Sequence, residues 1–173
     1  MPTCNASSAG SMRFLYLVAP VLLMGVLTDQ ASKSWASLRA AEPRILVPGY
    51  LAAYSVPNAG CLLGFGGDQA QANTVFALLS IACATVLVRI AYAVQGQLRG
   101  ADCLAGAMVL AGIFGNTVDR VALGHVRDFL VTWALPRLAF NVADLLLVVG
   151  VASLFLARCC DRRHDRSDLG FSR

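Results

Sequence analysis

Four apolar stretches separated by polar segments dominate the pattern along the chain. A helix needs roughly 20 mostly apolar residues to cross a hydrocarbon core of about 30 Å, and somewhat fewer when its polar ends reach the interface. The pattern therefore predicts an all-α membrane fold with four transmembrane helices, forming a single membrane domain over residues 1–173. The predicted spans cover about 14–28, 73–94, 103–118 and 142–157.

The first stretch has a second interpretation as a secretory signal peptide, because Arg13 precedes an apolar run of suitable length. The run leads directly into Asp29-Gln-Ala-Ser-Lys33, without a clear cleavage site flanked by small residues. We therefore expect the chain to keep all four helices.

A short extended segment is expected between the first two spans. Residues 44–56 are rich in Val, Ile, Leu and Tyr, and Pro48-Gly49 interrupts them. This pattern is typical of a hairpin. The fold class is thus four transmembrane helices with a small β-containing extracytoplasmic segment that lies on the membrane.

The basic residues indicate the topology. An even number of spans places both termini on one side, and basic residues favour the cytoplasmic side. The segment 158–173 follows the last span and contains five arginines. We expect both termini in the cytoplasm, a cytoplasmic tail over 158–173, and outer segments at about 29–72 and 119–141.

Composition agrees with a membrane protein and excludes several other classes. The chain is 57% hydrophobic and 14% charged, whereas soluble domains contain about 25% charged residues. The net charge of +4 is spread along the chain, so we expect no nucleic-acid partner. The six cysteines form no C-x-x-C motif and no ligand-like spacing with the two histidines. We therefore expect no metal site and no cofactor.

Polar residues gather at the outer ends of the predicted helices and in the outer loops. Such groups are costly near lipid, so they are expected to face a protein interior or a wet cleft and to be functional. They are Asp29, Lys33, Asn58, Asn116, Asp119, Arg120, Asp128, Asn141 and Asp144.

Helical spacing brings several of these residues together. Asp29 and Lys33 are four apart with the acid first, which favours a salt bridge that either is purely structural or supports a site. Asn116, Asp119 and Arg120 follow an i, i+3, i+4 pattern and share one helical face. This group is either a polar helix end or part of the same site.

Asp144 also has two interpretations. With Asn141 it forms the sequence pattern of a capping box at the start of the last helix. Alternatively, it pairs with Asp128. Two carboxyl groups held close together share a proton, so one can take a proton from water while the other polarises a carbonyl. That division of roles is what an aspartic protease requires.

These residues form five motifs that resemble those of lipoprotein signal peptidase, also called signal peptidase II, a family of bacterial inner-membrane aspartic proteases. One motif alone is weak, but five in the right order and on one predicted side are specific. They are Asp29-Gln-Ala-Ser-Lys33, Asn58-Ala-Gly60, Gly112-Ile-Phe-Gly-Asn116-Thr-Val-Asp119-Arg120, Gly124-His-Val-Arg-Asp128-Phe129 and Phe140-Asn141-Val-Ala-Asp144.

The resemblance implies a role for each residue. Asp128 and Asp144 would be the catalytic dyad. The other members would bind substrate or support the site: Asn58, Gly60, Asn116, Arg120, Asn141, Asp29, Lys33 and Asp119. One stretch departs from the family pattern, because the residues after Gly60 are the bulkier Cys61-Leu-Leu-Gly-Phe65.

The resemblance also implies the partners and the location. The substrate would be a prolipoprotein whose cysteine already carries diacylglycerol, cut just before that cysteine, while its lipid chains stay in the membrane. Globomycin-type cyclic peptides would inhibit the enzyme. The active site would lie at the outer, periplasmic face of the bacterial inner membrane.

Two functions from other classes are possible on the sequence alone. A small proton or ion carrier would use Asp144 as an intramembrane relay, but it predicts acids near mid-span rather than at one surface. A noncatalytic assembly partner would use the glycine-rich face of the third span. A metalloprotease is less compatible, because the chain has no H-E-x-x-H motif.

Overall fold

The computed structural model describes residues 6–39, 43–58, 69–94, 97–132 and 138–170, with side chains described within 15–159. Over these ranges the chain forms four long helices and one four-stranded antiparallel sheet. Each helix is long and apolar enough to cross a membrane, as predicted. The elements are α1 (Ala6–Leu38), β1 (Arg44–Val47), β2 (Leu51–Asn58), α2 (Gln69–Val94), α3 (Gly100–Leu123), β3 (Val126–Thr132), β4 (Leu138–Phe140) and α4 (Val142–Gly170).

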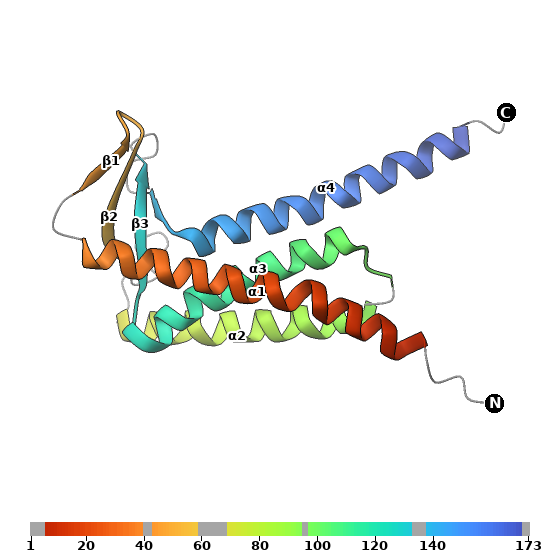
Figure 1. Ribbon diagram of the computed structural model, residues 1–173, viewed down its shortest axis with the longest axis horizontal. Helices are drawn as coiled ribbons and strands as arrows, with labels where there is room; N and C mark the ends of the chain where they lie inside the picture. The colour runs from red at the N-terminus through yellow and green to blue at the C-terminus, as the bar shows by residue number, and fades with distance from the viewer. Residues whose placement is uncertain (1–5, 40–42, 59–68, 95–96, 133–137, 171–173) are drawn as a thin grey trace.

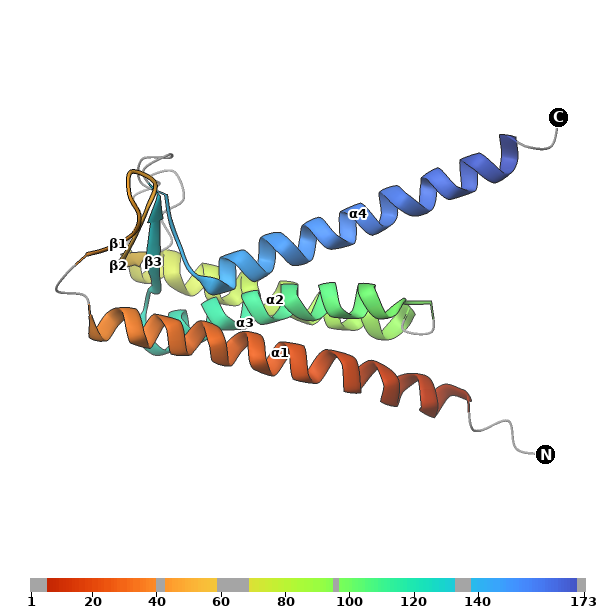
Figure 2. The same ribbon diagram turned by 45° about the horizontal axis from the view of Figure 1, so that its top comes forward.

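Helix α3 forms the centre of the bundle and contacts each of the other three helices (Figure 2). The outer helices expose large apolar side chains, including Leu23 on α1, Leu79 on α2 and Val148 on α4. Such exposure is unfavourable in water but suits a hydrocarbon solvent. A helix is also suited to lipid because its backbone hydrogen bonds are satisfied internally. The exposure pattern thus agrees with a membrane-embedded bundle.

Glycines allow α3 and α4 to pack backbone against backbone. A Cβ added at Gly112 would collide with the Ala143 carbonyl oxygen, and one added at Gly150 would lie 2.7 Å from a methyl carbon of Val109. Small residues at a helix interface permit this close approach in membranes. The packing places the start of α4 directly beside α3, where the polar residues lie.

The sheet lies at one end of the bundle, while α1 begins and α4 ends at the other end (Figure 1). Its strand order is β1-β2-β3-β4. The predicted hairpin over 44–56 is confirmed as β1 and β2, with Gly49 at a φ of 78° in the turn. Strands β3 and β4 complete the same sheet, and no short-range pattern in the sequence had predicted them.

The helices extend beyond the predicted spans. The first predicted span ends at residue 28 and the third at 118, whereas α1 continues to Leu38 and α3 to Leu123. Helix α3 ends where Gly124 adopts a φ of 76° and its N–H donates to the Arg120 carbonyl oxygen. The extra turns place the polar motifs on rigid helices. Helix α4 continues to Gly170, into the segment expected as a tail.

Candidate active site

Asp128 lies on β3, beside Asn58 of β2. Val126 pairs with Asn58 and Asp128 pairs with Val56, so Asn58 and Asp128 are diagonal neighbours on one face of the sheet. The Asn58 Nδ2 group donates a hydrogen bond to Asp128 Oδ2 at 2.8 Å. Strand pairing thereby orients one oxygen of this carboxyl group.

Asp144 occupies the first turn of α4 and closes a capping box. Its backbone N–H donates to Asn141 Oδ1 at 3.0 Å, and the Asn141 N–H donates to Asp144 Oδ2 at 3.1 Å. The capping interpretation is therefore confirmed. The second carboxylate oxygen is directed elsewhere, because Asp144 Oδ1 accepts a hydrogen bond from Asn116 Nδ2 at 2.8 Å. One side chain thus caps the helix and also faces α3.

Two buried amides connect the two carboxyl groups. Asn141 Nδ2 donates to Asp128 Oδ1 at 2.6 Å and to Asn116 Oδ1 at 3.1 Å. Asn116 in turn donates to Asp144. We call Asp128, Asp144, Asn58, Asn116 and Asn141 the carboxylate–amide cluster. It brings together residues from β2, α3, β3 and the start of α4.

The surroundings of Asp128 favour its protonated form. Burial raises the pKa of the Asp128 carboxyl group, and the negative charge of Asp144 raises it further. Hydrogen bonds from Asn58 and Asn141 and the positive charge of Lys33 act in the opposite direction, but the net shift is upward. The two carboxyl groups therefore influence each other electrostatically.

A second polar group, which we call the ion-pair cluster, lies against the first and consists of Asp29, Lys33, Asp119 and Arg127. Lys33 Nζ lies 2.7 Å from Asp29 Oδ2 and 3.6 Å from Asp119 Oδ2. Arg127 Nη2 lies 2.7 Å from Asp119 Oδ1. Asp29, Lys33 and Asp119 are fully buried. Each carboxylate of this cluster therefore faces a cation.

The two clusters meet at Asn116 and at the start of α4. Lys33 Nζ donates to Asn116 Oδ1 at 2.9 Å, which leaves the Asn116 amide nitrogen directed at Asp144. Asp29 Oδ1 accepts the Ala143 N–H at 2.8 Å. A Cβ on Gly115 would lie 2.6 Å from Asp29 Oδ2, so a glycine is needed for this approach. The ion-pair cluster thereby fixes the orientation of Asn116 and of the start of α4 in the carboxylate–amide cluster.

Two residues of this arrangement were not anticipated as site residues. Arg127 binds Asp119 through both its backbone N–H and its guanidinium group. Gln30 accepts from Arg127 Nη2 at 2.8 Å and donates to the Gly115 carbonyl oxygen at 2.9 Å. The available signal was strand alternation, which places Arg127 on the face opposite Asp128. No spacing rule predicts its pairing with Asp119 around the Gly124 turn.

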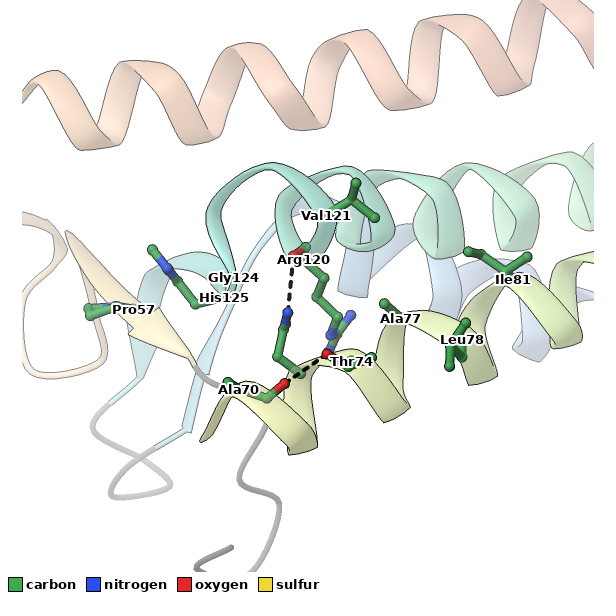
Figure 3. A pocket seen from close by; sticks show the side chains of 11 residues that line it. Pro57, Ala70, Thr74, Ala77, Leu78, Ile81, Arg120, Val121, Gly124 and His125 are labelled. Carbon is green, nitrogen blue, oxygen red and sulfur yellow. Dashed lines mark hydrogen bonds between the residues drawn. The ribbon is translucent and has the colours of Figure 1, made fainter. Parts of the chain in front are cut away.

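Arg120 diverges from the predicted shared face. Its side chain extends from α3 toward α2 (Figure 3). Its guanidinium carbon lies 5.7 Å from the ring centroid of Phe76, on α2. It remains within electrostatic reach of Asp128 and Asp144. Asn116 and Asp119 do face Lys33 together. Gly60 and the Cys61–Phe65 stretch lie outside the described residues.

The fold and this geometry define a class of protein: a multi-pass helical membrane protein with two carboxyl groups held in a buried amide network at one end of the bundle. A family model described as signal peptidase (SPase) II matches residues 21–160. The match covers most of the chain, which therefore belongs to the signal peptidase II family and is a membrane protease.

Known relatives agree with this assignment. The chain is 34% identical over 168 residues to a lipoprotein signal peptidase of Pseudomonas syringae pv. tomato, covering 90% of this chain and 92% of the relative. It is 31% identical over 168 residues to the lipoprotein signal peptidase of Neisseria gonorrhoeae, covering 92% and 98%. A solved structure titled as a bacterial membrane enzyme has a TM-score of 0.70 and 26% identity, covering 81% of this chain and 90% of that one.

Proposed function

We propose that this protein is an aspartic endopeptidase that removes the signal peptide from diacylglyceryl-modified prolipoproteins, cutting just before the lipidated cysteine. The observation on which the proposal rests is the joining of Asp128 and Asp144 through the hydrogen-bonded amides of Asn141 and Asn116. Family membership and the names of the relatives support prolipoproteins as the substrate class.

The proposed chemistry uses the two carboxyl groups as a pair that shares one proton. The ionised member takes a proton from water, and the water oxygen adds to the scissile carbonyl carbon. The protonated member donates a hydrogen bond to the carbonyl oxygen. The resulting gem-diol collapses when the leaving amine receives a proton. The negative charge of Asp144 contributes to the raised pKa of Asp128, so the two carboxyl groups interact as this scheme requires.

The amides of the carboxylate–amide cluster act as positioning groups in this scheme. Asn58 and Asn141 each donate to a different oxygen of Asp128. Asn116 is held by Lys33 and donates to Asp144. Groups held in place before the reaction do not need to be ordered during it, which lowers the barrier. We assign Arg120 and the outer loop residue Gly60 to substrate binding by family resemblance.

We also propose the orientation and location. The protein would lie in the inner membrane of a bacterium. The sheet end would face the periplasm, and the start of α1 and the end of α4 would lie on the cytoplasmic side. The arginine-rich segment 158–173 supports this orientation. Ile45, Leu46 and Val47 on β1 are exposed, which supports contact of the sheet with lipid. The lipid chains of the substrate would stay in the bilayer, and globomycin-type peptides would compete for the site.

The geometry disfavours the two other functions. The carboxyl groups lie at the sheet end of the bundle rather than near mid-span, unlike a proton relay. The glycine-rich face of α3 is occupied within the chain, because Gly112 packs against α4 and Gly115 against Asp29. That face is not available to an assembly partner.

The test is cleavage of a synthetic diacylglyceryl-modified precursor by the purified protein in lipid bilayers. Wild type is compared with Asp128→Asn, Asp144→Asn and a control, Asp102→Asn, which alters an aspartate near the opposite end of α3. We expect wild type and the control to cut before the lipidated cysteine, also in the presence of a chelator, and both dyad variants to be inactive while folded. Cleavage by either folded dyad variant would refute the dyad, and an inactive folded wild type would refute the function.

A further inference from the structure

An open cavity of about 930 Å³ lies between α2 and α3, and its wall includes Pro57, which precedes Asn58 of the carboxylate–amide cluster in the chain. Ala77 and Ile81 of α2 form part of its wall, and Arg120 of α3 points into it (Figure 3). Arg120 also lies within electrostatic reach of both Asp128 and Asp144. The cavity is therefore adjacent to the proposed reaction centre through this one side chain.

Two buried side-chain atoms of residues that line the cavity have no hydrogen-bond partner among the described residues. They are Oδ1 of Asn73, on α2, and Nε of Arg120. Asn73 is only 8% exposed. Buried polar atoms are nearly always paired, so an unpaired acceptor and an unpaired donor in one cavity indicate groups that a ligand satisfies. None of the family motifs described above includes Asn73.

The orientation of the Asn73 amide is fixed. Its Nδ2 group donates to the Arg120 carbonyl oxygen at 3.0 Å. A flipped amide would place two carbonyl oxygens against each other, so Oδ1 must be the atom left without a donor. Asn73 therefore holds the backbone of α3 at Arg120, and its Oδ1 is an acceptor without a donor in the wall of the cavity.

The unpaired atoms indicate the class of ligand. Asn73 Oδ1 requires an N–H or O–H group, and Arg120 Nε requires an acceptor. A diacylglyceryl group has ester oxygens but no N–H or O–H, so it cannot satisfy Asn73. A peptide group has one N–H and one C=O. The pair of atoms thus matches a polypeptide backbone rather than the lipid portion of a substrate.

We propose that Asn73 is a further substrate-binding residue, whose Oδ1 accepts a backbone N–H of the prolipoprotein while Arg120 Nε donates to a backbone carbonyl. This inference rests on the proposed function. One hydrogen bond of this kind corresponds to about a five- to tenfold effect on kcat/KM. Because it binds the peptide rather than the reacting atoms, we expect its loss to raise KM and to leave the pH profile unchanged.

The test combines a protein variant with backbone esters in the substrate. A series of lipidated precursor peptides carries an ester in place of one amide at a time, away from the scissile bond, which removes a single N–H. Wild type, Asn73→Leu and the control Thr74→Val are assayed with each peptide. Thr74 lies in the same cavity wall, but its hydroxyl group already donates to the Ala70 carbonyl oxygen.

We expect one ester position at which wild type and Thr74→Val lose about five- to tenfold in kcat/KM relative to the all-amide peptide. With the all-amide peptide, Asn73→Leu should already have a kcat/KM lower than wild type by a similar factor. The ester at that position should lower it no further, because the hydrogen bond is already absent. Losses that simply multiply at every position, or a wild type insensitive to every ester, would overturn the inference. Asn73→Ala replaces Asn73→Leu if thermal unfolding shows that the latter is not folded. A wild type that cleaves no lipidated peptide would instead refute the proposed function.

Discussion

The two polar clusters are neighbours and each contains two aspartates, but they satisfy these carboxylates differently. In the ion-pair cluster, Asp29 and Asp119 each lie 2.7 Å from a cationic nitrogen. In the carboxylate–amide cluster, the carboxylate oxygens of Asp128 and Asp144 accept hydrogen bonds from amide N–H groups. Both clusters lie at the same end of the bundle, and each has a buried centre, formed by Asp29, Lys33 and Asp119 in the first and by Asp128, Asn116 and Asn141 in the second.

This difference separates a structural role from a chemical one. A carboxylate paired with a buried cation is stabilised in its ionised form and is costly to leave unpaired. A carboxyl group held by neutral amides keeps its geometry in either protonation state, and a nearby second carboxyl group favours a shared proton. The ion-pair cluster is therefore suited to holding α1, α3 and α4 together, and the carboxylate–amide cluster to proton transfer.

The largest expected effect comes from the dyad. Asp128→Asn and Asp144→Asn should each lower kcat/KM by about 10³-fold or more, because each removes a proton-transfer group while preserving shape. Cleavage of the lipidated precursor measures the loss, and thermal unfolding in detergent measures folding. A folded dyad variant whose kcat/KM falls by less than tenfold would contradict the chemical role of the carboxylate–amide cluster.

Breaking the ion-pair cluster should chiefly affect stability. Asp29→Asn leaves Lys33 buried with its closest counter-ion removed, which we expect to cost about 3–5 kcal/mol of unfolding free energy. Adding Lys33→Met to this variant should restore part of that loss, because the unpaired charge is gone. Denaturant titration in mixed micelles gives both values. A double variant less stable than the single variant would contradict the account.

A smaller loss of stability is expected at Gly115. The added methyl group of Gly115→Ala would lie 2.6 Å from Asp29 Oδ2 and 3.1 Å from Ala143 Cβ, so the cost should be about 1–3 kcal/mol. Gly106→Ala on the same helix is the matched control, because nothing lies within 4 Å of its added carbon. The control should be neutral or slightly stabilising. Equal losses in both variants would show that the close contacts of Gly115 with Asp29 and Ala143 are not the cause of the effect.

The smallest effect concerns pH. The pKa of the Asp128 carboxyl group is raised, so the proton that the pair shares should be lost, and the alkaline limb of the activity profile should fall, at a pH above the ordinary aspartate range. Asn58 lowers that pKa through its hydrogen bond. Asn58→Leu should therefore move the alkaline limb upward by about one pH unit or less. The control Ser37→Ala removes a hydroxyl group that bonds within α1 and should leave the limb unchanged. A downward shift in Asn58→Leu would contradict this role.

Most of the fold and much of the site could be predicted from short-range patterns. Apolar run length predicted four helices, the break at Pro48-Gly49 predicted a hairpin, and the i, i+4 spacing predicted the Asp29–Lys33 pair. The Asn141–Asp144 capping box is likewise a local pattern. Each of these features depends on residues within a few positions of one another.

The features that were missed depend on tertiary packing. The pairing of β3 with β2 joins segments about 70 residues apart, and it brings Asn58 to Asp128. The contact of Gln30 with Gly115 spans 85 positions, and the Arg120–Asn73 contact spans 47. Hydrophobic periodicity does not specify which helix faces meet. The motifs therefore named most of the residues in the two clusters, but they indicated neither Gln30 and Arg127 nor the connections between the elements.

The most direct test of the division between the clusters is a paired measurement of melting temperature and cleavage on Asp128→Asn and Asp29→Asn, made on the same preparations. The account predicts that Asp128→Asn melts close to wild type and does not cleave. It predicts that Asp29→Asn melts well below wild type but retains a substantial part of wild-type kcat when assayed far below its melting temperature. An Asp128→Asn protein that cleaves, or an Asp29→Asn protein that is fully stable and inactive, would contradict it.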